Sequence, residues 1–216
     1  MVRNKMKLDT YFVPAKEEES KWLMFVLHGL GDSLNGYSWM PSEMQLPWMN
    51  YLLVNAPDEY YGGYSWYDIY GEAAPGIDRS RSLLTQLLNQ KCSEGYPPEN
   101  MYLFGFSQGC LMTLETGLCY QQKLAGLIGV SGYIHDLEGL INRAAPGSKE
   151  QRILITHGTY DPLLPFIPVK KQIQRLKELG YDIEWHEFQK EHTIAGEEEL
   201  KVIRDFARKP YPENLV

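Results

Sequence analysis

Short apolar runs alternate with longer amphipathic stretches along most of the chain, and this alternation restricts the fold more than any other feature. The runs with the length and composition of buried strands are 23–27, 51–55, 101–105, 124–130, 153–156 and 182–188. Several are nearly all apolar, as strands of a parallel sheet covered on both faces should be. The stretches 80–89, 169–179 and 197–207 repeat apolar residues at helical spacing. We therefore expect an α/β fold, with a mainly parallel central sheet and helices on both of its faces.

The size of the chain favours a single domain that spans residues 1–216. A chain of 216 residues is long enough for one sizeable core and short for two, and no linker-like break interrupts the strand and helix patterns. The formal net charge of −7 opposes attraction to polyanions. We expect no nucleic-acid partner and no binding to anionic membrane surfaces.

The cysteines and the apolar segments bear on location. Cys92, Cys110 and Cys119 form no C-x-x-C pair, and one of them would lack a partner in any disulfide scheme. No stretch of about 18 apolar residues occurs, and charged residues interrupt any signal-peptide core near the N-terminus. We expect a cytoplasmic protein with reduced thiols and no stable membrane insertion.

A serine lies at the sharpest turn that the pattern predicts. The pentapeptide Gly105-Phe106-Ser107-Gln108-Gly109 follows an apolar run and precedes the helical stretch 110–115. Glycines on both sides of a serine permit a tight strand-to-helix turn that exposes the hydroxyl group at the carboxyl end of the strand. An ordinary small-residue turn can have the same sequence. The position at a strand-to-helix junction favours a nucleophile that forms acyl-enzymes.

A serine nucleophile needs a histidine base within hydrogen-bond reach. His192 lies in the loop between the last strand and the last helix, from which an imidazole can reach back to Ser107. A solvated loop histidine beside Lys190 and Glu191 is the alternative interpretation of the same position. The other histidines lie within strands or after them and are interpreted as structural: His28, His135, His157 and His186.

A carboxylate must hold the tautomer and orientation of that histidine. Asp161 ends the run 153–160 and is followed by Pro162, which breaks the chain at the carboxyl end of a strand. Asp136 is the alternative, because it follows the preceding strand. It continues into the next segment without a comparable turn, so we favour Asp161.

Acyl transfer also requires two backbone N–H groups directed at the oxyanion. The residue after the nucleophile, Gln108, supplies one. The segment His28-Gly29-Leu30-Gly31-Asp32 follows the first long strand, and its glycines let the backbone approach a substrate carbonyl. Leu30 is the expected second donor, and an ordinary glycine-rich turn is the alternative.

Taken together, these motifs resemble the phospholipase/carboxylesterase family of α/β-hydrolases, which includes acyl-protein thioesterases and lysophospholipases. The resemblance covers nearly the whole chain and implies an α/β-hydrolase fold without a large cap domain. It implies Ser107 as nucleophile, Asp161 and His192 as the rest of the triad, and Leu30 and Gln108 as oxyanion donors. It rests on Leu27-His28-Gly29-Leu30-Gly31-Asp32-Ser33, Asn55-Ala56-Pro57, Trp66-Tyr67-Asp68, Gly105 to Gly109, His157-Gly158-Thr159-Tyr160-Asp161-Pro162 and His192.

Two features depart from the family pattern. Family members usually carry a glycine just before the histidine, where this chain has Lys190-Glu191. The segment 58–71 is unusually rich in tyrosine. The geometry of the histidine loop and the substrate preference therefore cannot be copied from relatives.

Substrate contacts are expected from two segments near the proposed centre. Tyr64 and Trp66 belong to the tyrosine-rich segment, and Leu163 and Leu164 follow Asp161 directly. The loop after the first long strand either lines an apolar cleft or caps the core; its large side chains are Trp39, Met40, Met44, Trp48 and Met49. Because no cap domain fits within the chain, we expect a shallow and open site.

The expected activity is hydrolysis of ester or thioester bonds of acyl substrates through an acyl-enzyme on Ser107. The substrate is a small-molecule ester or thioester, a lysolipid or an acylated protein. This chemistry requires no metal and no cofactor, and the sequence contains neither H-E-x-x-H nor a P-loop lysine. The alternatives are a lactone hydrolase of the dienelactone type, a peptidase, and a non-catalytic binding protein. We expect a monomer or a weak homodimer.

Overall fold

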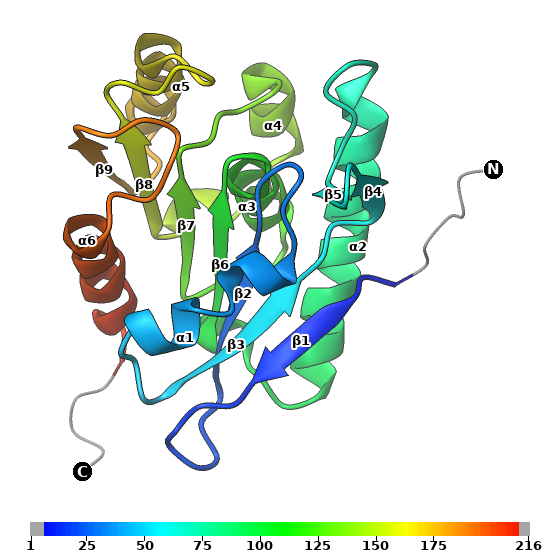
Figure 1. Cartoon of the computed structure of the whole chain (residues 1–216), viewed down its shortest axis with the longest axis vertical. Coiled ribbons are helices and arrows are strands. Elements are labelled where there is room, and N and C mark those ends of the chain that lie inside the picture. Colours follow the sequence, from blue (N-terminus) through cyan, green and yellow to red (C-terminus); the bar gives the residue numbers. More distant parts are fainter. Residues whose placement is uncertain (1–6, 212–216) are drawn as a thin grey trace.

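A seven-stranded sheet forms the centre of the computed structural model, which describes residues 7–211 (Figure 1). The strands lie in the order β1-β3-β2-β6-β7-β8-β9. All neighbouring pairs are parallel except β1 with β3. The prediction of a mainly parallel sheet is confirmed. The strands are β1 (Thr10–Val13), β2 (Trp22–Leu27), β3 (Met49–Val54), β6 (Met101–Phe106), β7 (Gly126–Val130), β8 (Ile153–Gly158) and β9 (Ile183–Phe188).

Helices cover both faces of this sheet, as predicted. Side chains of α2, α3, α4 and α5 pack into one apolar cluster, and side chains of α1 and α6 pack into a second cluster on the opposite face. Within residues 7–211, no segment forms a large cap over the sheet (Figure 1). The helices are α1 (Met40–Glu43), α2 (Ala73–Ser93), α3 (Gln108–Cys119), α4 (Leu137–Arg143), α5 (Phe166–Glu178) and α6 (Glu197–Arg208). Short 3-10 turns lie at Leu34–Tyr37, Pro98–Asn100 and Ser148–Glu150.

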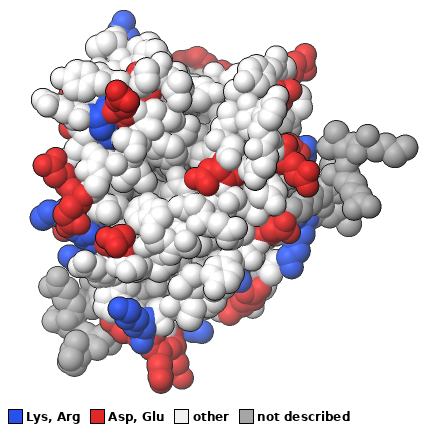
Figure 2. Space-filling view, viewed as in Figure 1, with Lys and Arg blue, Asp and Glu red and all other residues white. Residues whose placement is uncertain are grey.

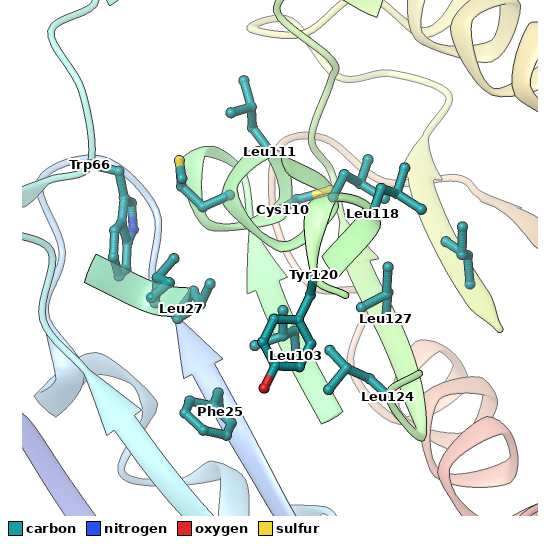
Figure 3. Packing of buried hydrophobic residues seen from close by; sticks show 14 of the residues in the cluster. Phe25, Leu27, Trp66, Leu103, Cys110, Leu111, Leu118, Tyr120, Leu124 and Leu127 are labelled. Carbon is teal, nitrogen blue, oxygen red and sulfur yellow. The ribbon is translucent and has the colours of Figure 1, made fainter. Parts of the chain in front are cut away.

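The two clusters follow from the two-residue period of a strand. In β2, Phe25 and Leu27 point into the first cluster, whereas Met24 and Val26 point into the second. Figure 3 shows the first cluster, in which leucines of the strands face those of α3. Because both faces of the sheet are buried, the sequences of its central strands are continuous apolar runs.

The sequence pattern does not predict several of the strands or the start of one helix. Strand β1 is short and mostly exposed, so it lacks the apolar signal of the central strands. Strands β4 (Asp58–Tyr60) and β5 (Gly63–Ser65) form a hairpin in the tyrosine-rich segment. The helix expected over 80–89 begins earlier, at Ala73. Proline and glycine are poor helix formers, so their presence in the first turn does not indicate a helix. The first turn of a helix nevertheless tolerates proline.

The strand order places the carboxyl ends of β2 and β6 side by side at a reversal of the winding. Strand β2 connects to β3 on one side, and the chain then crosses to β6 on the other side of β2. In sheets of this kind, ligands bind beyond the carboxyl ends of the strands at such a reversal. The segment His28–Asp32 follows β2 and Ser107 follows β6, so both lie at this point.

Candidate active site

Ser107 occupies a strained backbone conformation between β6 and α3. Its φ of 54° and ψ of −116° lie in a region that side-chain-bearing residues rarely adopt. The N–H of Ser107 donates to the carbonyl of Val130 at 2.9 Å, which joins the turn to the end of β7. A Cβ atom on Gly109 would clash with the carbonyl oxygen of Leu27. The glycine therefore permits the close approach of α3 to β2 that the elbow requires.

His192 and Asp161 complete a hydrogen-bonded chain with this serine. The Nε2 atom of His192 lies 2.9 Å from the Oγ of Ser107, and its Nδ1 atom lies 2.7 Å from the Oδ2 of Asp161. The carboxylate can only accept, so Nδ1 carries the proton and Nε2 faces the serine hydroxyl as an acceptor. The fold thus brings together three side chains from the ends of β6, β8 and β9.

The loop after β8 fixes the carboxylate of Asp161. The residue is buried, and its Oδ1 accepts hydrogen bonds from the N–H groups of Leu163 and Leu164, each at 2.9 Å. Burial alone would raise the pKa of Asp161. The bonds from Leu164, His192 and Leu163 outweigh burial and lower the pKa below its ordinary value. The group is therefore held as an anion beside the imidazole.

The rival candidates lie elsewhere or have other partners. Asp136 accepts the N–H of Gly139 at 2.9 Å and caps α4. His135 is exposed, and His186 lies within β9. His157 is fully buried, with its Nε2 bonded to the carbonyl of Leu164 at 2.9 Å. Within the described residues, none of these groups hydrogen-bonds to the side chain of Ser107, so we interpret them as structural.

The two expected oxyanion donors are the backbone N–H groups of Leu30 and Gln108. Within residues 7–211, neither the N–H of Leu30 nor that of Gln108 donates a hydrogen bond. A Cβ atom on Gly29 would lie 3.4 Å from the Cβ of Ser107, which shows how closely the loop after β2 approaches the elbow. An oxyanion hole requires two such donors close to the nucleophile.

His28 holds the loop that carries Leu30. Its Nε2 accepts the N–H of Ala56 at 3.1 Å, so the proton of the neutral ring is on Nδ1, which donates to the carbonyl of Gly29 at 2.6 Å. Burial lowers the pKa of His28 and favours this neutral form. The Gly29 carbonyl and the Leu30 N–H are opposite ends of one planar peptide, so fixing one orients the other.

Trp66 and Gln108 have buried structural partners. Trp66 is completely buried, and its Nε1 donates to the carbonyl of His28 at 2.9 Å. The Gln108 side chain accepts the backbone N–H of Trp66 at 3.0 Å and donates to the carbonyl of Tyr67 at 3.0 Å. The side chain of Trp66, which the sequence suggested as a substrate contact, lies instead in the core cluster with Leu27 (Figure 3). An indole packed in the core does not reach an open substrate cleft.

The other suggested substrate residues differ in how far their side chains are exposed. Tyr64 is half-buried in β5, and its backbone pairs with Gly31 and Asp32 of the loop after β2. Leu163 is 68% exposed, whereas Leu164 is half-buried. Both leucines approach the centre through the N–H groups that hold the aspartate. Of the four residues, only Leu163 presents a largely exposed apolar side chain.

An open pocket of about 340 Å³ lies directly beside His192. Most of its wall comes from the loop after β2 and from the histidine loop. Of the aromatic and methionine residues in 39–49, only Trp39 lines it, because the other four are buried in the core. Phe106 and Ile194 are wall residues that the sequence did not suggest, although Phe106 directly precedes Ser107 and Ile194 is two residues after His192. The lining residues are Asp32, Gly36, Tyr37, Trp39, Phe106, His192, Thr193 and Ile194.

Comparison with known proteins places this chain in a family. The family model described as phospholipase/carboxylesterase matches residues 8–210. The chain belongs to the phospholipase/carboxylesterase family. The resemblance stated from the motifs is thereby confirmed, and the chain is a member of a hydrolase family.

Similarity to individual proteins supports the assignment to this family. The chain is 32% identical over 178 residues to acyl-protein thioesterase 1 of Schizosaccharomyces pombe, covering 74% of this chain and 77% of that protein. It is 28% identical to acyl-protein thioesterase 1 of Kluyveromyces lactis, covering 94% and 96%. Among solved structures it resembles esterase PE8, with a TM-score of 0.81, 29% identity and coverage of 94% and 98%. The α/β-hydrolase fold expected from the sequence is confirmed.

Two further observations concern membranes and metals. No helix in the described part of the chain is both long and apolar enough to span a bilayer. Among residues 7–211, histidine, cysteine and acidic side chains form no group of three that could hold a metal ion.

Proposed function

We propose that this protein is a cytoplasmic serine hydrolase that cleaves ester or thioester bonds of acyl substrates through an acyl-enzyme on Ser107. The observation that carries the proposal is the position of His192. Its two ring nitrogens lie 2.9 Å from the serine hydroxyl and 2.7 Å from the Asp161 carboxylate. These are the distances at which an imidazole can take a proton from the hydroxyl while a carboxylate stabilises the resulting cation.

The reaction begins with attack of the Ser107 oxygen on the substrate carbonyl. His192 Nε2 takes the hydroxyl proton, and the tetrahedral oxyanion accepts hydrogen bonds from the N–H groups of Leu30 and Gln108. The protonated imidazole then donates its proton to the leaving alcohol or thiol as the carbonyl–heteroatom bond breaks. A water molecule, deprotonated by the same nitrogen, attacks the acyl-enzyme and releases the carboxylic acid and the free serine.

The pocket beside His192 suits the apolar part of an acyl substrate. Trp39, Phe106 and Ile194 contribute apolar wall, and the volume of about 340 Å³ is at the lower end of the range for small-molecule sites. The names of the relatives include an esterase and acyl-protein thioesterases. We therefore propose small-molecule esters or thioesters, lysolipids or acylated proteins as substrates. The assignment of cytoplasmic location rests on the free cysteines Cys92, Cys110 and Cys119.

Hydrolysis of p-nitrophenyl esters from acetyl to palmitoyl, and of thioesters with the same acyl chains, tests this proposal. We expect Ser107→Ala to abolish hydrolysis, because it removes the hydroxyl that bonds to His192 Nε2. A fluorophosphonate probe should label the wild type and not the variant. The chain-length optimum then measures how much acyl chain the pocket accepts.

The same assay distinguishes the alternatives. Activity on lactones or peptides in place of acyl esters would indicate a lactone hydrolase or a peptidase on the same fold. A folded wild-type protein with no hydrolysis and no labelling of Ser107 would contradict the proposal. It would favour a non-catalytic binding protein.

A further inference from the structure

A buried ion pair joins the loop of His192 to the last helix. The Nζ of Lys190 lies 2.6 Å and 2.8 Å from the two carboxylate oxygens of Glu199. The Lys190 side chain is 3% exposed and that of Glu199 is 0% exposed. Charged side chains of these types are almost never so fully buried unless they are paired, so the pair is a specific feature of this loop.

Glu199 also binds the far end of the same loop. Its Oε2 accepts the N–H of Ala195 at 2.6 Å, while Oε1 accepts from the Lys190 ammonium. One carboxylate in the first turn of α6 therefore contacts the residues that flank the segment 191–194 on both sides. His192 lies within that segment, which forms neither a helix nor a strand.

The backbone of Lys190 connects the loop to the part of the fold that carries Asp161. Its carbonyl accepts the N–H of Tyr160 at 3.2 Å. A Cβ atom on Gly158 would clash with the same carbonyl oxygen. The end of β8 and the start of the histidine loop therefore lie in direct contact. The distance from His192 to Asp161 depends on this contact.

Stability alone does not explain the pair. Taking two charges out of water costs several kcal/mol per ion, and replacing a buried pair by apolar residues of similar size is often neutral or stabilising. A hydrogen bond between charged groups is, however, shorter and stronger than a neutral one, so the pair fixes the separation of the two groups that it joins.

We propose that the Lys190–Glu199 ion pair is a positioning clamp that holds His192 within reach of both Ser107 and Asp161. The proposal rests on the proposed function, since it assigns a task within the same serine-histidine-aspartate reaction. Lys190 and Glu199 touch no reacting atom. They act through the backbone of residues 190 and 195.

The central variant replaces both charges by apolar residues, Lys190→Met with Glu199→Leu, so that no buried charge is left unpaired. The matched control is Lys201→Gln with Asp205→Asn. It removes an ion pair of 2.6 Å on the same helix whose side chains are 67% and 47% exposed. Each variant is assayed for kcat and KM with p-nitrophenyl butyrate, for the rate of fluorophosphonate labelling, and for Tm.

We expect the apolar pair to keep or raise Tm while kcat and the labelling rate fall by roughly 10- to 100-fold, because a misplacement of about 1 Å can cost about a hundredfold. KM should stay unchanged, since an interaction that serves only the transition state lowers kcat and kcat/KM equally. The control should match the wild type in every measurement. A folded apolar-pair variant with wild-type kcat and labelling rate would overturn the proposal.

A second variant keeps the test decisive if the apolar pair does not fold. Glu199→Gln retains the shape of the side chain but has a single acceptor oxygen in place of two, and it removes the counter-charge of the Lys190 ammonium. We expect kcat to fall by roughly three- to tenfold at unchanged KM, because charge-assisted hydrogen bonds are about twice as strong as neutral ones. Wild-type kcat in this variant would also overturn the clamp. Ser107→Ala in the same series separates the two proposals, because its residual activity would contradict the proposed function itself.

Discussion

The carboxylate of Asp161 shows how single residues of this centre depend on groups that are not catalytic. Backbone N–H groups of Leu163 and Leu164 bind one oxygen, and His192 binds the other. The leucines that the sequence suggested for substrate contact therefore also position the acid. Their N–H groups act whatever side chain follows Asp161, which explains why side-chain patterns alone do not reveal this role.

Asp161→Asn is expected to lower kcat by about four orders of magnitude, as loss of the orienting carboxylate does in other triads. It should also change the pH dependence of stability. The pKa of Asp161 in the folded protein is below its ordinary value of 3.8, so the ionised group stabilises the fold above that pH. This contribution is lost as the pH falls through the folded-state pKa.

Urea unfolding of the wild type and of Asp161→Asn between about pH 7 and pH 3 measures the effect. The difference in unfolding free energy between the two proteins should shrink as the pH falls. A difference that stays constant over this range would show that the carboxylate has no depressed pKa in the folded state.

At the scale of elements, the close contact of β2, β6 and α3 creates the elbow. Gly109 lies where α3 meets the end of β2, and Gly105 lies where β6 meets α3. A Cβ atom on either glycine would clash with backbone atoms, on Leu27 and on Gly109 respectively. Backbone cannot move aside as the end of a flexible side chain can, so the two glycines are required by packing as well as by the turn.

Gly109→Ala is accordingly expected to destabilise the protein by more than an ordinary overpacking substitution, which costs about 1–3 kcal/mol. Thermal unfolding provides the measurement, with Gly147→Ala as the control. A Cβ atom on Gly147 meets no atom within 4 Å, and its φ is −86°. The control should keep the wild-type Tm or raise it slightly. Equal Tm values for the two variants would contradict the packing argument.

The strands that the sequence pattern predicts are more deeply buried than the strands that it does not predict. Strands β2, β3, β6, β7 and β8 are almost wholly buried and read as apolar runs. Strand β1 and the β4–β5 hairpin lie at the periphery, where polar and aromatic side chains mask the strand period. The hairpin turn relies on Gly62 with a φ of 89°, a conformation set by the backbone and not by any periodic pattern.

At the scale of the whole molecule, the surface charge limits the partners. The net charge is −7. On the face shown in Figure 2, acidic and basic side chains mix around the edge, and the middle is mostly uncharged. A protein with this charge gains no long-range attraction to polyanions.

Sedimentation with vesicles tests this consequence. We expect the bound fraction at low salt to be no greater with phosphatidylserine in the vesicles than with phosphatidylcholine alone. Binding that rises with anionic lipid content and falls with added salt would show a local basic surface that outweighs the net charge. The same salt series with duplex DNA tests the expected lack of nucleic-acid binding.

The sequence by itself determined the fold class and the family, because buried parallel strands leave long apolar runs and the elbow needs small residues beside its serine. It also singled out Ser107, Asp161 and His192, since the ends of parallel strands meet at one edge of a sheet. Which side chains reach open space follows from the three-dimensional packing of the loops. This packing placed Trp66 in the core, Trp39 and Phe106 at the pocket, and Lys190 against Glu199. Local patterns report burial and turns, whereas these contacts depend on where distant loops come together.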